Sequence, residues 1–127
     1  MTKTICKKFE KKNAYPLSGG WVSSRNHWNN RAAIIECKNG YKALQSYGTI
    51  VLVLYRGKLY RTWEGYSRTT SNHVGRFCEM HGFKKIGKSE WENMPCFLTN
   101  IEPLPIDYIY SDSFYKCDYF KKFRIIY

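Results

Sequence analysis

Acidic side chains are scarce in the first three-fifths of this 127-residue sequence, and none of them are grouped. Residues 1–76 contain three, Glu10, Glu36 and Glu64, which lie far apart along the chain. Metal-dependent nucleases and phosphotransferases need clustered carboxylates, so this scarcity argues against such catalysis. A glycine-rich phosphate loop of the Walker or Gly-x-Gly-x-x-Gly type is also missing, and we therefore expect no nucleotide cofactor.

Long apolar runs and paired cysteines are missing as well. No run approaches the roughly twenty apolar residues of a membrane-spanning helix, and the first lysines are not followed by the apolar core of a signal peptide. The five cysteines form no Cys-x-x-Cys pair and have no histidine at zinc-finger spacing. We expect reduced thiols, no metal and no membrane contact, in a single domain that acts in the cytosol.

Positive charge is plentiful and unevenly distributed. The formal net charge is +11, with 14 Lys and Arg against three acidic residues in residues 1–76 and seven of each in residues 77–127. This one-sided excess favours a polyanionic partner, either DNA or RNA or a ribonucleoprotein. The alternative is a solvated surface that only keeps the protein soluble.

Residues 49–55 form an apolar, β-branched run that predicts a strand buried on both faces at the centre of a sheet. Asn39-Gly40 predicts a hairpin turn between the two preceding strands, Gly48 a turn directly before the run, and Arg56-Gly57 a hairpin turn directly after it. Four strands are expected, at 32–38, 41–47, 49–55 and 58–63. Links this short cannot form parallel crossovers, so the sheet should be an antiparallel meander.

The apolar period becomes helical beyond residue 69. Val74, Phe77 and Cys78 recur on one helical face, with Thr69 or Thr70 as the expected N-cap. Gly82 then supplies the left-handed position that ends the helix. The predicted fold class is therefore α+β, an antiparallel meander of four or more strands packed on one main helix.

A short extra helical turn is predicted downstream. Ser89-x-x-Glu92 has the pattern of a capping box, and Pro95 ends the turn at once. Trp91 is expected to attach this turn to the core.

The segments flanking the 32–82 core are less regular. Residues 1–13 hold five lysines and predict a mobile basic arm or an opening strand, with a frayed terminus as the alternative. Residues 14–30 predict a long loop whose Trp21 and Trp28 stack on bases or cover the core. In the extension 96–127, residues 108–110 and 119–127 predict two strands, or one strand and a tail.

Candidate binding residues fall into three groups. The predicted hairpin carries the basic and aromatic mix of a sheet that meets nucleic acid, in Arg56, Lys58, Tyr60 and Arg61. The start of the main helix offers free backbone N–H groups, hydroxyls and cations to a phosphate, in Arg68, Thr69, Thr70, Asn72 and Arg76. The N-terminal stretch adds Lys7, Lys8, Lys11 and Lys12. Helix capping and solvated hairpin tips explain the same residues without a ligand.

No catalytic residue is predicted. His73 and His81 are eight residues apart without the His-Glu-x-x-His arrangement, and so form no compact ligand pair. We expect a neutral His73 in the first turn and a His81 that interacts favourably with the helix dipole. Cys78 falls on the predicted buried stripe, where a thiol is unreactive.

Two stretches of the sequence carry a resemblance to a known family: Trp63-x-Gly65-Tyr66-Ser67-x-Thr69-Thr70-x-Asn72-His73 and Lys88-Ser89-Glu90-Trp91. With them the chain resembles a small uncharacterised domain family of phages, plasmids and other mobile elements of Gram-positive bacteria. The resemblance covers about residues 41–95 and implies a genetic context, because this family has no established catalytic residues. The resulting expectation is a non-enzymatic binding protein that engages nucleic acid or a nucleoprotein through a basic face. The alternative is an anti-CRISPR-type inhibitor that binds a host CRISPR nuclease or its guide-RNA complex.

Overall fold

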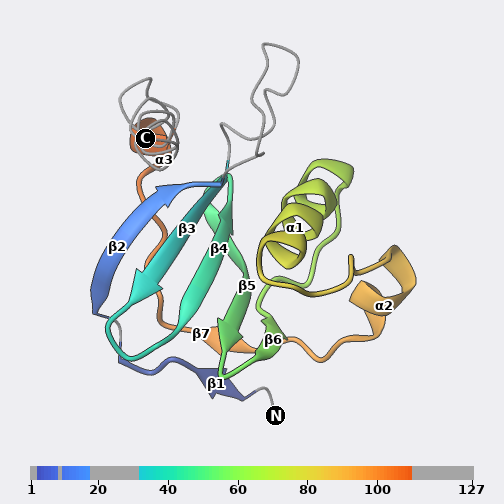
Figure 1. The fold of residues 1–127 in the computed structure, drawn as a ribbon, viewed down its shortest axis with the longest axis horizontal. Coiled ribbons are helices and arrows are strands. Elements are labelled where there is room, and N and C mark those ends of the chain that lie inside the picture. The colour runs from blue at the N-terminus through green and yellow to red at the C-terminus, as the bar shows by residue number, and fades with distance from the viewer. Residues whose placement is uncertain (1–2, 9, 18–31, 110–127) are drawn as a thin grey trace.

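The computed structural model of the protein describes residues 3–8, 10–17 and 32–109. Its main feature is a five-stranded antiparallel sheet in the order β2-β3-β4-β5-β6, in which each strand pairs with its sequence neighbours (Figure 1). The strands are β2 (Lys11–Pro16), β3 (Ala32–Cys37), β4 (Lys42–Ser46), β5 (Thr49–Tyr55) and β6 (Lys58–Arg61). The predicted α+β meander is confirmed, and β2 extends its four strands to five.

The apolar run of β5 is buried on both faces, as predicted, but it is not the middle strand of the sheet. That position belongs to β4, because β2 adds a strand on the far side of β3. A β-bulge in the β4–β5 pair lets Val51 and Leu52 pack on the same face of the sheet, while Ile50 and Val53 pack on the other. Three of the four predicted strands are also one or two residues shorter than expected.

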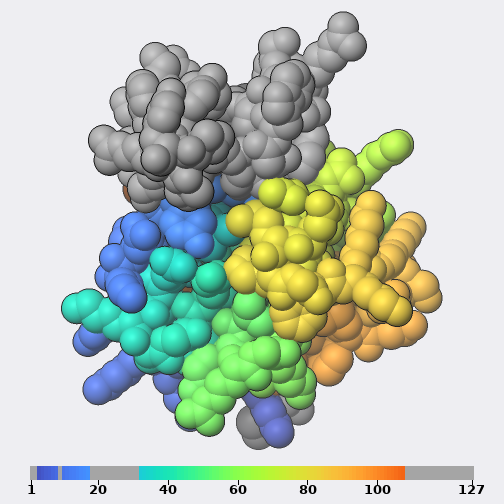
Figure 2. All heavy atoms as spheres, viewed as in Figure 1, coloured from blue at the N-terminus to red at the C-terminus, as the bar shows by residue number. Residues whose placement is uncertain are grey.

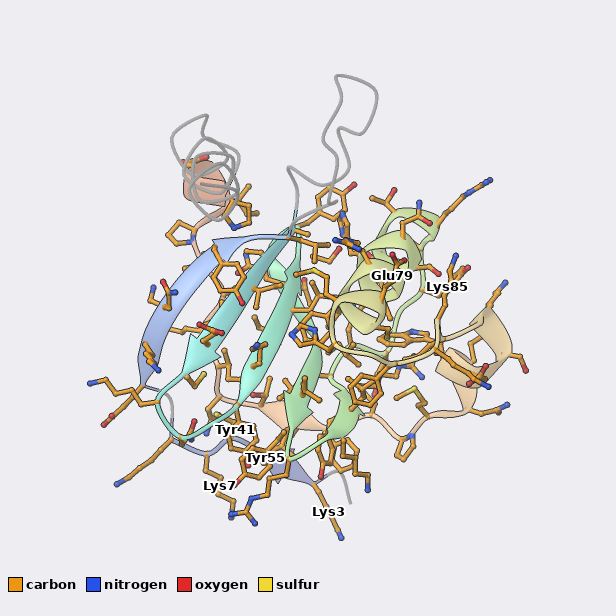
Figure 3. All side chains as sticks on the ribbon, viewed as in Figure 1. Lys3, Lys7, Tyr41, Tyr55, Glu79 and Lys85 are labelled. Carbon is orange, nitrogen blue, oxygen red and sulfur yellow. The ribbon has the colours of Figure 1, made fainter. Side chains whose placement is uncertain are left out.

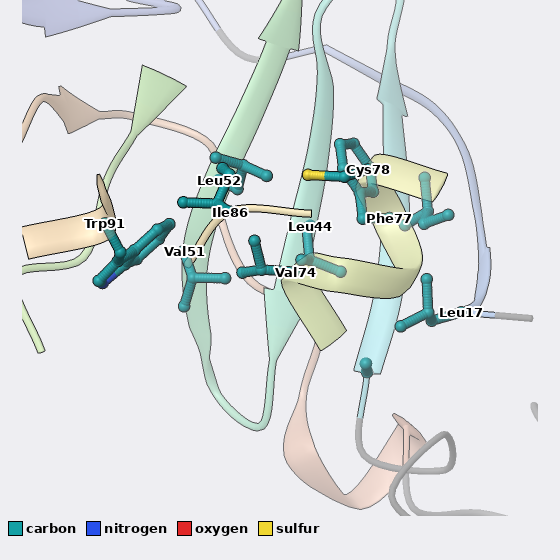
Figure 4. Close-up of a cluster of buried hydrophobic side chains, with 11 residues drawn as sticks. Leu17, Leu44, Val51, Leu52, Val74, Phe77, Cys78, Ile86 and Trp91 are labelled. Carbon is teal, nitrogen blue, oxygen red and sulfur yellow. The ribbon is translucent and has the colours of Figure 1, made fainter. Parts of the chain in front are cut away.

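One face of the sheet is covered by α1 (Arg68–Met80) and α2 (Lys88–Asn93). The buried cluster between these layers includes Leu44, Val51, Leu52, Val74, Phe77, Cys78 and Trp91 (Figure 4). Phe77 and Leu52 have no solvent exposure, and each such side chain contributes about 1.5–3 kcal/mol to folding. The helical periodicity therefore identified the packing face of α1.

The opposite face is covered by two distant segments of the chain. The strands β1 (Thr4–Ile5) and β7 (Leu98–Thr99) pair in parallel, and the chain after β7 runs back across the sheet (Figure 1). Cys6, Ile101 and Leu104 fill this second cluster. The sheet is thus the middle of three layers, which explains why its strands are apolar on both sides.

The sequence predicted the C-terminal end of α1 correctly but not its N-cap residue. Its N-cap is Ser67, whose hydroxyl accepts a hydrogen bond from the Thr70 N–H at 3.1 Å, so the prediction of Thr69 or Thr70 was wrong. At the other end, Gly82 has a φ of 79°, and the Phe83 N–H donates to the Cys78 carbonyl at 2.8 Å. This is a Schellman end, and it confirms Gly82 as the predicted left-handed residue that ends the helix.

The short helix α2 exists, but Ser89 does not cap it. Its N-cap is Gly87, with no side-chain hydrogen bond, which places Ser89 inside the first turn. Trp91 is buried, as expected. A third helix, α3 (Ile106–Ile109), replaces the strand predicted at 108–110, and the strand predicted at 119–127 lies outside the described residues.

Within residues 1–13, the described part follows the opening-strand alternative rather than a mobile arm. β1 pairs with β7, and β2 forms an edge of the main sheet from Lys11 onward. β2 also includes Ala14, Tyr15 and Pro16, which the sequence had assigned to a loop. Leu17 is buried in the core, and the rest of that predicted loop from residue 18 on, including Trp21 and Trp28, lies outside the described residues.

Candidate nucleic-acid interface

Positive side chains gather at one end of the sheet, where the β3–β4 and β5–β6 turns lie beside the N-terminal segment. We call this set the basic rim, and it consists of Lys3, Lys7, Lys8, Lys38, Arg56 and Lys58, all of which are exposed. Figure 3 labels Lys3 and Lys7 beside Tyr41 and Tyr55. Tyr41 follows the β3–β4 turn, and Tyr55 precedes the β5–β6 turn. In the space-filling view the β5–β6 turn and residues near the N-terminus project together at the lower edge (Figure 2).

Backbone and side-chain contacts hold these separate segments together. The Asn39 amide donates to the Lys8 carbonyl at 3.2 Å, and the Lys38 N–H donates to the Glu10 carbonyl at 2.8 Å. On the other side of the rim, the Leu98 N–H donates to the Lys3 carbonyl at 2.9 Å. The spacing of the rim is therefore fixed by the fold.

Aromatic rings support the cations of the rim. Tyr41 and Tyr55 stack with ring centroids 3.9 Å apart and an interplanar angle of 5°, so they join the two turns. The Arg56 guanidinium lies 5.1 Å from the Tyr55 centroid, and the Lys58 ammonium lies 5.3 Å from that of Tyr60. Exposed cation–π contacts of this kind contribute about 0.5–1 kcal/mol each, so they restrain the side chains without neutralising them.

None of the six rim residues forms an ion pair among the residues that the structure describes. The ion pairs in that part of the chain are Lys42 with Glu36 at 3.4 Å and Arg76 with Glu79 at 3.1 Å, and neither includes a rim residue. Glu10 is exposed nearby and forms no ion pair there. A group of like charges without partners attracts polyanions.

Two predicted contact residues are buried and belong to the core instead. Arg61 is 6 % exposed, and its guanidinium donates to the carbonyls of Trp63 and Trp91, both at 2.7 Å, as well as to that of Glu64. Thr70 is 5 % exposed and shares a hydrogen bond of 2.9 Å with the Ser46 hydroxyl. Arg61 is used by the core, which contradicts its prediction as a surface contact, whereas Thr70 also contributes to the lining of the pocket described below and stays a prediction.

The helix start lies at the other end of the sheet from the basic rim. The Ser46–Thr70 hydrogen bond places it beside the end of β4, whereas the rim lies at the opposite ends of β4 and β5. The seven residues of β5 separate the two ends by about 20 Å. The expected single basic face is therefore divided in two.

The remaining predicted contacts are distributed as follows. Arg68 is exposed at the helix start, where Thr69 and Asn72 are half-buried. Arg76 pairs with Glu79 one turn further along. Lys11 and Lys12 are exposed on the edge strand β2. Tyr60 packs edge-on against Phe97, with ring centroids 5.2 Å apart.

Sequence reasoning missed Lys3 and Lys38. Alternate turns of a meander lie at the same end of the sheet, so the Lys38-Asn39-Gly40 and Arg56-Gly57 turns were bound to be neighbours. Lys38 could therefore have been found from the predicted topology. Lys3 could not, because the parallel pairing of β1 with β7 has no local sequence signal.

A small pocket lies between the first turns of α1 and the helix α2. It is a small hollow whose empty space of about 220 Å³ includes open solvent, and its interior has room for about one water molecule. Its lining includes Trp63, Tyr66, Ser67, Ser71, Ile86 and Trp91. Much of this lining comes from the Trp63-x-Gly65-Tyr66-Ser67 string, so the string that sequence analysis singled out forms a cavity wall as well as a helix start.

The histidines and the helix cysteine are positioned by the core. His73 has no exposure, and its Nδ1 shares a hydrogen bond of 2.8 Å with the Ser46 hydroxyl. His81 Nδ1 bonds the Phe77 carbonyl at 2.8 Å, and burial lowers its pKa, which disfavours the charged form expected from the helix dipole. Burial raises the pKa of the Cys78 thiol to about 11, so it stays protonated at neutral pH.

No helix in the described part of the chain is long and apolar enough to cross a membrane. Nor do the described residues contain a cluster of three or more His, Cys, Asp or Glu side chains placed to hold a metal ion.

Comparison with protein-family models gives a match over residues 15–93 to a family of unknown function (DUF8033). Comparison with curated proteins and with solved structures gives no match. The matched range begins in β2 and ends with α2. It therefore contains the two basic turns and the lining of the pocket, but not Lys3, Lys7 or Lys8.

Proposed function

Because the chain belongs to this family of unknown function, its activity has to be inferred from its own surface, and we propose that it is a non-enzymatic protein that binds nucleic acid along the basic rim. The observation that carries the proposal is a set of six exposed cations from three chain segments, without ion-pair partners among the described residues. Phosphate contacts from Lys and Arg supply most of the affinity in sequence-independent binding.

The arrangement of the rim suits a phosphate backbone. Its cations come from the β3–β4 turn, the β5–β6 turn and the N-terminal segment, so they are spread over the sheet end rather than forming one point charge. The stacked Tyr41 and Tyr55 place aromatic rings among those charges. Basic grooves with aromatic side chains are typical of proteins that bind single strands without sequence preference.

Salt dependence tests the proposal. If all six rim cations contact phosphates of a single strand, log K should fall against log salt with a slope of about −4. Fluorescence anisotropy with a labelled 20-nucleotide strand, measured from 50 to 300 mM salt, gives this slope directly. An affinity that does not fall with rising salt would exclude the proposed mechanism.

A matched pair of variants locates the interface. Lys58→Gln and Lys84→Gln each remove one exposed lysine, but Lys84 lies after α1, away from the rim. Lys58→Gln should make the salt slope shallower by about 0.7, whereas Lys84→Gln should leave it unchanged. Equal effects from both variants would show that charge is read over the whole surface and not at the rim.

The second candidate function is an anti-CRISPR-type inhibitor of a host nuclease. The same unpaired cations could meet a guide RNA or an acidic protein surface, and the resemblance to phage and plasmid domains supplies the context. On either reading we place the protein in the bacterial cytosol, because Cys6, Cys37, Cys78 and Cys96 are free thiols.

The two functions can be separated by experiment. Addition of the protein to a purified CRISPR effector should abolish cleavage if it is an inhibitor, and Lys58→Gln should weaken that inhibition. Binding to free nucleic acid together with no effect on several effectors would leave the first function alone.

A further inference from the structure

We propose that one base of a single-stranded nucleic acid stacks on the Tyr41–Tyr55 pair at its Tyr55 end, beside the Arg56 guanidinium, while lysines of the basic rim contact the flanking phosphates. This inference rests on the proposed function and adds the substrate class, because the paired bases of a duplex keep their ring faces covered. It requires a flat ring face within a basic surface, and the contacts of the pair supply one.

The pair has an inner and an outer ring. Tyr41 packs against the buried cluster that contains Cys37 and Val53, whereas Tyr55 packs against neither buried cluster. The two rings are nearly parallel and their centroids are 3.9 Å apart, close to the roughly 3.4 Å between stacked bases. Tyr55 is half-buried, so part of the outer ring meets solvent. The core therefore fixes Tyr41, and Tyr41 holds Tyr55 in an orientation that a base can continue.

The backbone at Arg56 is unfavourable for an arginine. Arg56 and Gly57 form the two-residue loop between Tyr55 and Lys58, with φ of 51° and 75°, as in a type I′ turn. Such turns prefer Asn at the first position, because larger side chains fit the left-handed region poorly. This turn places the guanidinium over the Tyr55 ring, 5.1 Å from its centroid. Backbone strain is concentrated at functional sites, and unpaired bases stack on guanidinium groups as well as on aromatic rings.

The pair lies between the two basic turns. Tyr41 comes directly before β4 and Tyr55 ends β5, and these strands are neighbours in the sheet. Lys38 belongs to the turn on the β3 side, and Lys58 follows the turn on the β6 side. Adjacent strands are about 4.8 Å apart, so the centres of the two turns are separated by about 10 Å. Three nucleotides, at roughly 3.4 Å each, span this distance, so a base on the pair can have a phosphate at each turn.

The charge around the pair favours an anionic ligand. The three segments that form the rim, residues 3–8, 37–41 and 55–60, contain six Lys and Arg and no acidic residue. The nearest acids along the chain are Glu36, which pairs with Lys42, and the exposed Glu10. Lys3 and Lys7 lie beside the two rings (Figure 3). A phosphate chain is therefore attracted to the same surface that carries the ring face.

The test compares strands with and without bases. A labelled twelve-nucleotide oligothymidine and an abasic strand of the same length carry the same phosphates, but only the first can stack. Tyr55→Ala removes the outer ring, and Tyr55→Phe keeps it. Tyr47→Ala is the matched control, because Tyr47 is 38 % exposed on the β4–β5 turn at the other end of the sheet. Circular dichroism checks that each variant is folded.

We expect the wild type to bind oligothymidine about tenfold more tightly than the abasic strand. Tyr55→Ala should remove this difference without weakening the abasic strand, whereas Tyr55→Phe and Tyr47→Ala should keep it. If the pair only stabilises the hairpins, Tyr55→Ala will weaken both strands equally or neither, and base stacking is then overturned. A loss from Tyr47→Ala as large as that from Tyr55→Ala would overturn the location.

Arg56→Asn tests the strained turn. Asn is preferred at the first position of a type I′ turn, so this variant should melt a few degrees higher than the wild type. It also removes a cation and a stacking group, so it should weaken both strands, with the larger loss for oligothymidine. Lys84→Gln, the control for the rim, should weaken neither strand. Unchanged binding by Arg56→Asn would overturn the role of Arg56 beside the base.

A cross-linking measurement on the wild type needs no variant. 5-Bromouracil in place of one thymine forms a covalent bond to a stacked aromatic ring under ultraviolet light, with loss of HBr. Mass spectrometry of the cross-linked complex should locate this bond at Tyr55. Cross-links confined to aromatic residues outside the pair would overturn the assignment.

The two proposals can fail separately. Equal binding of the two strands by the wild type, weakened by Lys58→Gln, would overturn base stacking and leave the basic rim in place. A duplex of the same length carries twice the phosphates, and tighter binding of that duplex than of oligothymidine would overturn the preference for single strands in the same way. Binding of polyglutamate without binding of any of these nucleic acids would overturn both proposals in favour of an acidic protein partner.

Discussion

The guanidinium of Arg61 lies over the indole ring of Trp91, 4.9 Å from its centroid, and donates a hydrogen bond of 2.7 Å to the Trp91 backbone carbonyl. The same group donates to the carbonyls of Trp63 and Glu64. A single buried cation from β6 therefore joins the sheet to α2 and to the segment that leads into α1. The pocket described above lies between these parts.

Replacing Arg61 should destabilise the fold strongly. Arg61→Met keeps a long apolar side chain but leaves several buried carbonyls without a donor, at a cost of about 3 kcal/mol in the free energy of unfolding. Arg68→Ala, at an exposed position of the first helical turn, should change this free energy by less than about 0.5 kcal/mol. Urea unfolding followed by circular dichroism measures both. A loss below about 1 kcal/mol for Arg61→Met would contradict the structural role.

The different positions of Arg56 and Arg61 show where sequence reasoning stops. The alternation of side chains along a strand places Arg61 on the same face of β6 as Leu59, which packs on the core together with Trp63. Nothing in that pattern indicates that this cation is buried, because its partners include a carbonyl thirty residues later, at Trp91. The sequence could predict which face a side chain occupies but not which distant carbonyls would meet it.

Gly65 is a second residue whose role depends on one neighbour. A methyl group at this position would lie 2.4 Å from Trp63 Cζ2, so Gly65→Ala must displace the Trp63 ring. We expect a loss of about 1–3 kcal/mol in stability, together with a change in tryptophan fluorescence. Gly87→Ala is the matched control, because its nearest heavy atom, Glu90 Oε1, would be 3.9 Å away. Similar losses from both variants would mean that the close Trp63 contact is unimportant.

The sequence could predict roughly where α1 begins, but not which residue caps it. Ser67, Thr69 and Thr70 all have side chains able to cap α1, and local propensity does not choose among them. The fold chooses, because the Thr70 hydroxyl is bonded to Ser46 inside the core and leaves the capping position to Ser67. The start of α3 had two conflicting signals in the sequence. Pro105, immediately before the helix, favours a helix start, whereas the Tyr-Ile-Tyr pattern of residues 108–110 favours a strand, and the strand was predicted.

Two serine substitutions test the assignment of the caps. Ser67→Ala removes the hydroxyl that accepts from the Thr70 N–H and should cost about 1 kcal/mol. Ser89→Ala removes a hydroxyl inside the first turn of α2 and should be neutral or slightly stabilising, because alanine has the higher helix propensity. Thermal melts of the two variants give the comparison. A loss for Ser89→Ala equal to that for Ser67→Ala would restore the capping box that the structure replaces with Gly87.

The buried thiols make stability sensitive to alkaline pH. Burial raises the pKa of Cys78 from 9.0 to about 11, so between these values the folded state holds a proton that the unfolded state has lost. The stabilisation is complete below about pH 9 and falls by about 1.4 kcal/mol per pH unit as the pH rises towards 11. Cys78→Ala lowers stability at every pH by removing a buried side chain, but it should also make this decline shallower by that amount. Urea unfolding of both proteins between pH 8 and pH 11 separates the two effects, since lysines and tyrosines ionise in both. Parallel declines would show that the Cys78 thiol does not titrate differently in the folded and unfolded states.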